Sequence, residues 1–150
     1  RTEIINVNGK LEEQIEEIWD ENLLPNPGWV LYSRYKIFYD LDGLTEKEEI
    51  SDWDTDLEPP NWVVTTRVEY VRSDTNPQLI KTYLDCYVEP CENSQRTISS
   101  YYPNGNLQTS ITELWDEDLG ESGEWTDYSQ YDYEYDGNNN RTILEYYIIS

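Results

Sequence analysis

The sequence predicts an all-β protein, an antiparallel meander of about ten strands built from about four tandem β-hairpin repeats in a single-layer or curled sheet. Residues 8–43 align with residues 104–139 at an offset of 96 without a gap. The chain has no Ala and is rich in Tyr and Trp, residues that favour strands over helices. Turn-forming dipeptides recur about every 30 residues, at Asn8-Gly9, Asp42-Gly43, Asn76-Pro77, Asn104-Gly105 and Asp136-Gly137. Each interval holds two strands of about ten residues and a loop, which predicts one hairpin per repeat.

The repeat is recognised by a Trp-Asp-x-Asx-Leu motif followed by a second Trp. The first Trp stands at Trp19, Trp53 and Trp115, and the second at Trp29, Trp62 and Trp125. In the degenerate third copy, Cys86 and Cys91 take the place of the Trp pair. We expect a single repeat domain over residues 1–150, with units at 8–43, 44–77, 78–105 and 106–139 and a closing strand at 140–150.

Alternation within the best-defined strands predicts an aromatic face and a charged face. One face would carry Trp29, Leu31, Ser33, Tyr35, Ile37 and Tyr39, and its copy Trp125, Asp127, Ser129, Tyr131, Tyr133 and Tyr135. The other face would carry Arg34, Lys36, Gln130, Asp132 and Glu134. Tyr32, Phe38 and Tyr128 break the alternation because they fall on the charged side.

The segment Leu11–Ile18 alone resembles an amphipathic helix, with apolar residues at Leu11, Ile15 and Ile18 and Glu between them. Its copy, Leu107–Leu114, is rich in β-branched and hydroxyl residues, and two copies of one unit should share a conformation. We therefore expect strands in both. In Thr45–Asp52 the apolar phase is shifted by one residue, which a β-bulge would absorb.

Both ends of such a meander would be unpaired edges, one near the N-terminus and one at Ile143–Ile149. The second edge is apolar and carries a single charge. Edges of this kind pair readily with other strands, so we expect further repeats or another copy of the molecule to cover them.

The charge balance excludes several classes of partner. Against 32 acidic residues there are only 10 Lys and Arg, a formal net charge of −22, which disfavours nucleic acid and anionic membrane surfaces.

Six Trp and 14 Tyr argue against a disordered tail. No apolar run reaches about 18 residues, so membrane insertion is not predicted. The first residue is Arg1 without an apolar leader, which suggests a processed chain or a fragment.

The two cysteines predict a disulfide between Cys86 and Cys91 across a hairpin loop. Closing so small a ring would add about 2 kcal/mol by the chain-entropy model. It also indicates an oxidising compartment and hence an extracellular or cell-surface protein. The alternative is two free thiols in a cytosolic protein. One Cys pair without His does not form a zinc site.

No catalytic motif is present, and we predict that the protein is not an enzyme. Without His there is no Ser-His or Cys-His dyad, and no phosphate-binding loop appears. Calcium is the one cofactor considered, since short Asp-x-Asp spacings supply oxygen ligands; the candidates are Asp20, Asn22, Asp54, Asp56, Asp116 and Asp118. The alternative is that these residues form turns by bonding to their own backbone.

The aromatic residues also have two interpretations, as a platform for sugar rings or as the packed face of a sheet. The candidate ladder consists of Trp19, Trp29, Trp53, Trp62, Trp115, Trp125, Tyr35, Tyr131 and Tyr133.

The strings Tyr39-Asp40-Leu41-Asp42-Gly43, Tyr135-Asp136-Gly137-Asn138 and Tyr101–Leu107 resemble the YD-type and MORN-variant hairpin repeats of bacterial surface and secreted proteins. The resemblance implies export, hairpin arrays and a structural or adhesive role. The predicted function is therefore an extracellular structural or adhesive repeat protein that assembles with itself, edge to edge or head to tail, through its open edges into a fibre or surface layer. The alternative is a carbohydrate-binding module that binds a surface glycan through the aromatic ladder.

Overall fold

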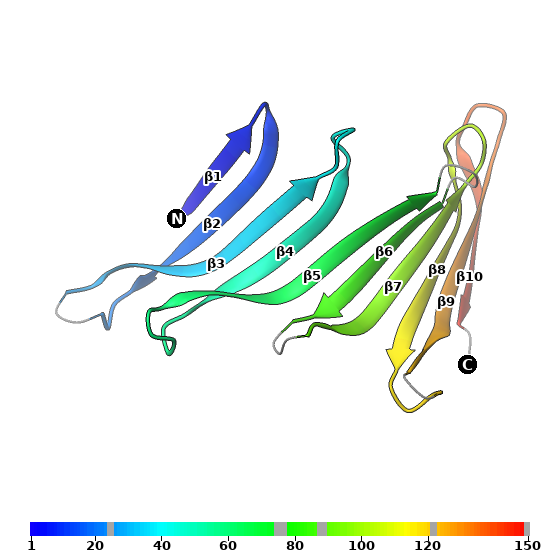
Figure 1. Ribbon diagram of the computed structural model, residues 1–150. Helices are drawn as coiled ribbons and strands as arrows, with labels where there is room; N and C mark the ends of the chain where they lie inside the picture. The colour runs from blue at the N-terminus through cyan, green and yellow to red at the C-terminus, as the bar shows by residue number, and fades with distance from the viewer. Residues whose placement is uncertain (24–25, 74–77, 87–89, 121–122, 149–150) are drawn as a thin grey trace. The chain divides into compact units, whose positions relative to one another are not determined.

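The computed structural model describes residues 1–150 apart from 24–25, 74–77, 87–89, 121–122 and 149–150 (Figure 1). In that part of the chain all regular structure is strand, and the strands hydrogen-bond in chain order, from β1 to β10, in one antiparallel sheet. The all-β meander is thus confirmed. The strands are β1 (Thr2–Val7), β2 (Lys10–Asp20), β3 (Gly28–Tyr39), β4 (Thr45–Asp54), β5 (Asn61–Ser73), β6 (Gln78–Asp85), β7 (Glu92–Tyr101), β8 (Leu107–Asp116), β9 (Glu124–Tyr135) and β10 (Arg141–Ile148).

The two Glu-rich segments, of which Leu11–Ile18 has helical periodicity, are strands, as expected. Leu11–Ile18 lies within β2 and Thr45–Asp52 lies within β4. The predicted turn at Asn76-Pro77 and the edge residue Ile149 lie outside the described residues.

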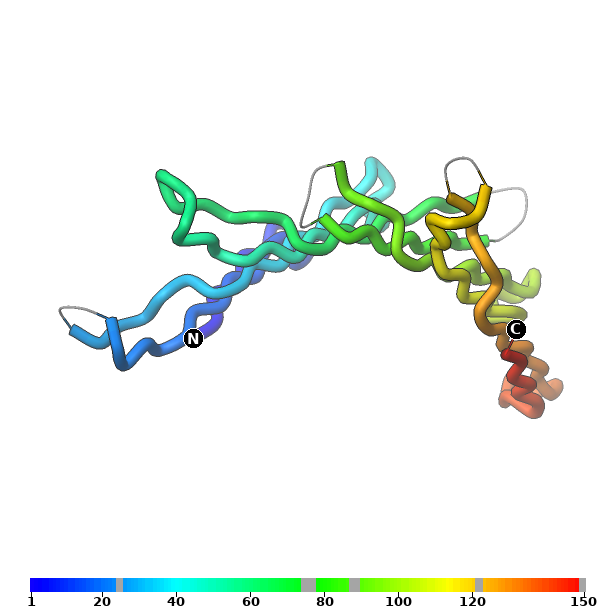
Figure 2. Tube along the Cα trace, turned by 90° about the horizontal axis from the view of Figure 1, so that it is seen from below, coloured from blue at the N-terminus to red at the C-terminus, as the bar shows by residue number. Residues whose placement is uncertain are grey.

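The chain divides into two compact units, which are treated separately below. Unit 1 comprises residues 1–68 and 85–92, and unit 2 comprises residues 69–84 and 93–150. Within each unit the strands make their main contacts with sequence neighbours and form one layer (Figure 2). Few described residues are buried, and these are mainly small or polar: Ser51, Thr65, Val68, Cys86, Glu113 and Ser129. Stability therefore depends on contacts between adjacent strands rather than on a central core.

Three of the turns share one hydrogen-bonding pattern. The N–H of Asp40 donates to the carbonyl of Leu44, and the same contact joins Tyr102 to Asn106 and Asp136 to Asn140. The residue before the closing position is left-handed in each turn, with φ of 76° at Gly43, 86° at Gly105 and 69° at Asn139. Gly137 has no positive φ. The left-handed position of the last turn is thus Asn139 rather than the glycine of the predicted turn signal, as Asn tolerates this conformation better than most residues.

A β-bulge follows every one of these turns and also the tight turn at Asn8-Gly9. The register of the hairpins skips one residue on the second strand of each: Glu12, Glu46, Gln108 and Thr142. The bulge expected in Thr45–Asp52 is therefore present, at Glu46. Because it recurs in the other copies, it belongs to the repeat.

A second bulge corrects the predicted faces. Where β2 pairs with β3, Trp19 lies opposite Trp29 and Glu17 lies opposite Leu31. The next pair is Glu16 with Ser33, so the register skips Tyr32. The register of β8 and β9 skips Tyr128, the equivalent residue, in the same way. One extra residue reverses the side of the sheet on which every later side chain lies. Tyr32 and Tyr128, which disturbed the alternation in the sequence, are these bulge residues, and both are about half exposed.

The Trp residues therefore share their face with the cations, which the sequence had assigned to the other side. We call the side that carries Trp29 and Trp125 the Trp face. In β3 it continues with Leu31, Arg34 and Lys36, and in β9 with Asp127, Gln130 and Asp132. The opposite side, the Tyr face, carries Ser33 and Tyr35 in unit 1 and Ser129, Tyr131 and Tyr133 in unit 2. The predicted ladder of Trp, Tyr35, Tyr131 and Tyr133 is thus split between two faces.

Candidate functional site

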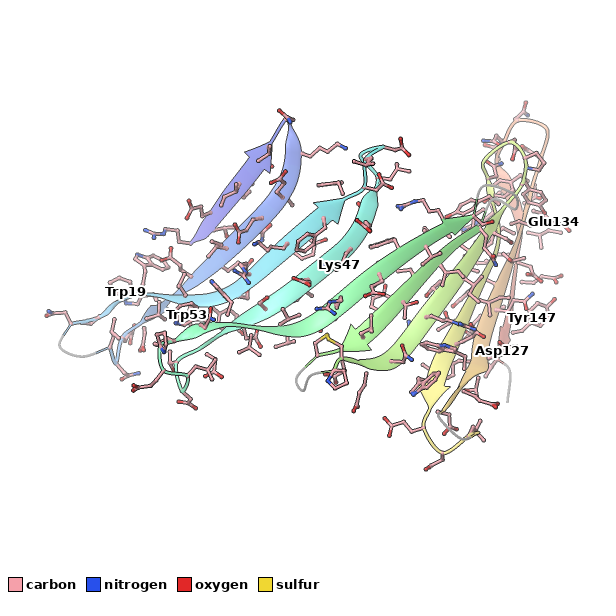
Figure 3. The ribbon with its side chains drawn as sticks, viewed as in Figure 1. Trp19, Lys47, Trp53, Asp127, Glu134 and Tyr147 are labelled. Carbon is pink, nitrogen blue, oxygen red and sulfur yellow. A yellow bond between two sulfur atoms is a disulfide. The ribbon has the colours of Figure 1, made fainter. Side chains whose placement is uncertain are left out.

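The six Trp side chains form three cross-strand pairs at the loop ends of the hairpins. Trp19 lies opposite Trp29 and Trp115 opposite Trp125. The ring centroids are 5.5 Å apart for Trp19 and Trp29, and 5.1 Å apart in each of the other two pairs, all edge to face. Figure 3 shows Trp19 and Trp53 beside the loops that their strands enter. Edge-to-face pairs of this kind add about 0.5–1.5 kcal/mol beyond area burial, so each pair closes the base of its loop.

In the degenerate copy a disulfide joins Cys86 to Cys91, with 4.2 Å between their Cα atoms (yellow in Figure 3). Cys86 is buried, and its N–H donates to the carbonyl of Thr65. The covalent bond stands where the other copies have a Trp pair. A disulfide is typical of proteins outside the reducing cytoplasm.

An arginine two strands away lies over the second Trp of each pair. The guanidinium carbon is 5.9 Å from the ring centroid for Arg1 and Trp29, 4.9 Å for Arg34 and Trp62, and 4.7 Å for Arg96 and Trp125. A cation over an indole face contributes about 0.5–2 kcal/mol, depending on desolvation. These contacts link strands that are not hydrogen-bonded neighbours, and they occupy part of the indole surface that a sugar ring would need.

The strand between arginine and Trp supplies the counterion in two of the three copies. Glu17 pairs with Arg1, and Glu113 pairs with Arg96, whose Nε and Nη2 each donate to a different carboxylate oxygen. The equivalent position in the middle copy is Ser51, which is 1% exposed. There the Nε atom of Arg34 is buried without a hydrogen bond, 3.8 Å from the nearest oxygen of Glu13. The three copies thus keep the Arg–Trp contact but differ in how the charge is balanced.

A row of alternating charges crosses β2 to β5 on the Trp face of unit 1. Glu13 lies opposite Lys36, Lys36 lies opposite Glu49, and Glu49 accepts from Arg67 at 3.2 Å and contacts Lys47 at 2.9 Å. Burial raises the pKa of Glu49, but Lys47 and then Arg67 outweigh it, and the net pKa is lowered. The row neutralises carboxylates that would otherwise repel one another across adjacent strands.

Every one of the ten cations of the chain is engaged within its own unit. Each contacts an aromatic ring or a carboxylate: Arg1, Lys10, Arg34, Lys36, Lys47, Arg67, Arg72, Lys81, Arg96 and Arg141. The 32 acidic residues far exceed the cations, so the surplus negative charge lies at the surface.

The calcium candidates form three equivalent Asx turns. The N–H of Asn22 donates to Oδ1 of Asp20 at 2.8 Å, that of Asp56 to Asp54 at 2.8 Å, and that of Asp118 to Asp116 at 3.0 Å. Among the described residues, no group of three or more Asp, Glu, Cys or His side chains is arranged to hold a metal ion. The Asp-x-Asx spacing thus coincides with a turn hydrogen bond in all three copies, as the turn-forming alternative predicts.

Unit 2 has an open hollow of about 480 Å³ beside two of its turns. Its walls are Tyr102, Pro103, Asn104, Asn106, Glu134, Tyr135 and Asp136. The rings of Tyr102 and Tyr135 meet edge to face at 6.3 Å, and the Tyr102 hydroxyl donates to the Tyr133 carbonyl. The Tyr102 hydroxyl is thus bonded to the backbone, and Glu134 and Asp136 are the acidic residues of the lining.

The last strand of the sheet order presents apolar side chains to solvent. Every residue of β10 is exposed, and β10 is paired on one side, with β9. Its large apolar side chains are 40% to 66% exposed: Ile143, Leu144, Tyr146, Tyr147 and Ile148. Tyr146 packs on Tyr131 of β9, with ring centroids 4.6 Å apart. At the other end of the order, β1 exposes Ile4, Ile5 and Val7 and pairs with β2.

The Arg–Trp contacts were not anticipated from the sequence, although a signal for them exists. Arg34, Arg67 and Arg96 each stand five residues after Trp29, Trp62 and Cys91. That fixed spacing marks one position of the repeat. The contact itself joins an arginine to a Trp two strands away. Aligning the repeat copies shows which positions are equivalent, but it does not show which positions touch.

No long apolar helix of the kind that crosses a membrane occurs in the described part of the chain.

No protein-family model matches the sequence, and no curated protein matches it. Among the solved structures that match, a protein of unknown function from Bacteroides fragilis NCTC 9343 is similar in fold; it is 17% identical, with a TM-score of 0.64 over 87% of this chain and 88% of that one.

Two further matching structures are DUF3836 family proteins. The one from Bacteroides vulgatus ATCC 8482 is 13% identical, with a TM-score of 0.47 over 62% of this chain and 86% of its own. The one from Parabacteroides distasonis ATCC 8503 is 16% identical, with a TM-score of 0.45 over 67% of this chain and 88% of its own. At these identities, the likeness to the Bacteroides fragilis protein concerns the fold alone.

Proposed function

We propose that the protein is an extracellular structural or adhesive repeat protein that assembles with itself through its sheet edges into a fibre or surface layer. The observation that carries the proposal is β10, a strand paired on one side whose five large apolar side chains are exposed. An exposed apolar edge strand is a template for pairing with another chain.

The distribution of charge supports edge association over other contacts. Strand β10 contains one cation, Arg141, and one carboxylate, Glu145, so it is locally neutral in a chain whose net charge is −22. The remaining surface is acidic and repels a second copy. Salt or a divalent cation would weaken that repulsion, and calcium enters the proposal in this role.

The disulfide supports a location outside the cytoplasm, and the YD-type and MORN-variant resemblance of the turn strings points to exported hairpin arrays. Extracellular or cell-surface placement is part of the proposal.

Assembly is tested by sedimentation velocity and negative-stain electron microscopy of the purified chain, in calcium and in chelator, at low and at physiological salt. We expect dimers and larger particles whose amount rises with salt or calcium. A chain that stays monomeric at high concentration in every buffer would refute the proposal.

A second candidate function is glycan binding, which one observation favours. Trp19 and Trp29 are 50% and 47% exposed, and the cation contact of this pair, from Arg1, is made with Trp29. The Trp19 ring therefore offers a stacking surface for a sugar. The test is glycan-array binding of the native chain, followed by Trp19→Ala with Trp115→Ala as a matched control. Binding lost in the first variant and kept in the second would support this function.

A further inference from the structure

We infer that β10 pairs antiparallel with β10 of a second copy, about a two-fold axis at Tyr146. This inference rests on the proposed function and specifies its first contact. It places Tyr146 opposite Tyr146 of the second copy, Leu144 opposite Ile148, and Glu145 opposite Tyr147. The contact is isologous, because each copy contributes the same strand.

The outward backbone groups of β10 follow from the repeat. In the equivalent hairpin of β1 and β2, Glu17 and Arg1 exchange both backbone hydrogen bonds. Tyr147 occupies the position of Glu17, counted from the bulge that follows the turn. Hydrogen-bonded and non-hydrogen-bonded residues alternate along an antiparallel pair. The backbones of Tyr147 and Glu145 therefore face β9, and those of Leu144, Tyr146 and Ile148 face outward.

The aromatic contact between β9 and β10 agrees with this phase. Tyr146 lies opposite Tyr131, and their ring centroids are 4.6 Å apart. Side chains approach most closely at non-hydrogen-bonded positions, so the N–H and C=O of Tyr146 point away from β9. Pairing about Tyr146 would provide hydrogen-bond partners for about six backbone groups of each copy, the N–H and C=O groups of Leu144, Tyr146 and Ile148, which now face solvent.

The side chains of this register complement one another on both faces. On the Tyr face, Tyr146 meets its own copy and Leu144 meets Ile148, so apolar groups that are now 48% and 66% exposed cover each other. On the Trp face, the carboxylate of Glu145 lies opposite the hydroxyl of Tyr147. Glu145 already accepts a hydrogen bond from Tyr147 of its own chain, so the two groups are chemically matched.

The registers centred on Glu145 and on Leu144 are less favourable. A centre at Glu145 would set two carboxylates opposite each other, next to Asp132, which lies opposite Glu145 on β9. A two-fold axis at Leu144 would place Ile143 opposite Glu145 of the second copy. It would also bring the bulge residue Thr142 into the paired region. The Tyr146 centre avoids both, and the neutral strand keeps the interface free of like charges.

Cysteine cross-linking tests the register. Glu145→Cys and Tyr147→Cys chains are purified separately, mixed, and oxidised under mild conditions, with circular dichroism confirming that each is folded. We expect a disulfide-linked dimer in the mixture, formed several-fold faster than in either variant alone, since identical positions would be diagonal neighbours about 7 Å apart. Tyr128→Cys, an exposed position on β9, mixed with Glu145→Cys measures the background reaction.

A charge exchange provides a second, independent test by sedimentation. Leu144→Lys and Ile148→Glu should each weaken dimerisation about tenfold or more, and the double variant should recover it, because each lysine then opposes a glutamate of the second copy. Within one strand these positions are about 13 Å apart, so rescue inside one chain is excluded.

The outcomes separate this inference from the proposed function. Assemblies without the 145–147 disulfide, or with 145–145 links predominating, would overturn the inference and leave self-assembly in place. A 145–147 dimer that never grows would support the inference and refute the fibre or layer, since an isologous contact closes on itself. Monomers throughout would overturn both.

Discussion

Arg96 and Trp125 lie two strands apart, on β7 and β9, yet the Arg96 guanidinium carbon is 4.7 Å from the Trp125 ring centroid. Glu113, on the strand between them, pairs with the same guanidinium and is 7% exposed. The arginine thus covers an indole and neutralises a buried carboxylate. In a sheet without a second layer, such contacts take the place of a core.

Removing the Arg96 charge should therefore destabilise unit 2. We expect Arg96→Met, which keeps much of the apolar stem, to lower the free energy of unfolding by about 1–3 kcal/mol, because the cation–π contact is lost and Glu113 is left buried and unpaired. Urea unfolding followed by circular dichroism measures the change. Arg141→Met is the matched control, since that guanidinium is 5.9 Å from Tyr133 on an exposed strand; its effect should stay below about 0.5 kcal/mol. Equal losses in the two variants would contradict the assigned role of Arg96.

Gly105 in the turn between β7 and β8, and Gly137 in the turn between β9 and β10, should respond differently to substitution. Gly105 has a φ of 86° and Gly137 has no positive φ, while an added Cβ would meet nothing within 4 Å at either position. Gly105→Ala should cost about 1 kcal/mol through backbone strain alone. Gly137→Ala should be neutral or stabilise by up to about 1 kcal/mol, since it restricts the unfolded chain. Thermal unfolding of the two variants decides the matter, and a reversed order would mean that the turn is assigned wrongly.

Reduction of the disulfide should open the loop end of β6 and β7. We expect loss of the Cys86–Cys91 bond to lower the free energy of unfolding by about 2 kcal/mol by the chain-entropy model. Reductant should shift the unfolding midpoint of the native chain to that of a Cys86→Ser, Cys91→Ser double variant. The double variant itself should be insensitive to reductant, and a native chain that is equally insensitive would argue against this contribution.

The last turn should weaken in acid. The Asn140 side-chain amide first, then its backbone N–H, hold the pKa of Asp136 below its ordinary value of 3.8, with a smaller opposing effect of burial and a further contribution from the Asn138 N–H. The stabilisation is present above pH 3.8 and is lost as the pH falls through the lower, folded-state pKa. Carboxyl titration by NMR should place Asp136 below its ordinary value, and Asn140→Ala should return its pKa toward that value. An unchanged titration in this variant would exclude the Asn140 side-chain amide as the cause.

The repeat at an offset of 96, the turn dipeptides and the strand-favouring composition determined by themselves that this chain is a ten-strand antiparallel meander. They also located the Trp pairs and the Cys pair, because residues that close a loop stand near it in the sequence. Even the helix-like segment Leu11–Ile18 was resolved by its copy, since equivalent segments of a repeat share a conformation.

The tertiary structure decided which residues share a face. In the sequence, Tyr32 and Tyr128 appear only as aromatic residues on the charged side of a strand of period two, because a bulge depends on the register of the partner strand. That one skipped residue moves Arg34 to the side of the Trp pairs and Tyr35 to the other. The Arg–Trp contacts two strands apart, and the left-handed Asn139 in place of Gly137, likewise depend on how neighbouring strands align. Such alignment is a property of pairs of strands, and no single segment of the sequence contains it.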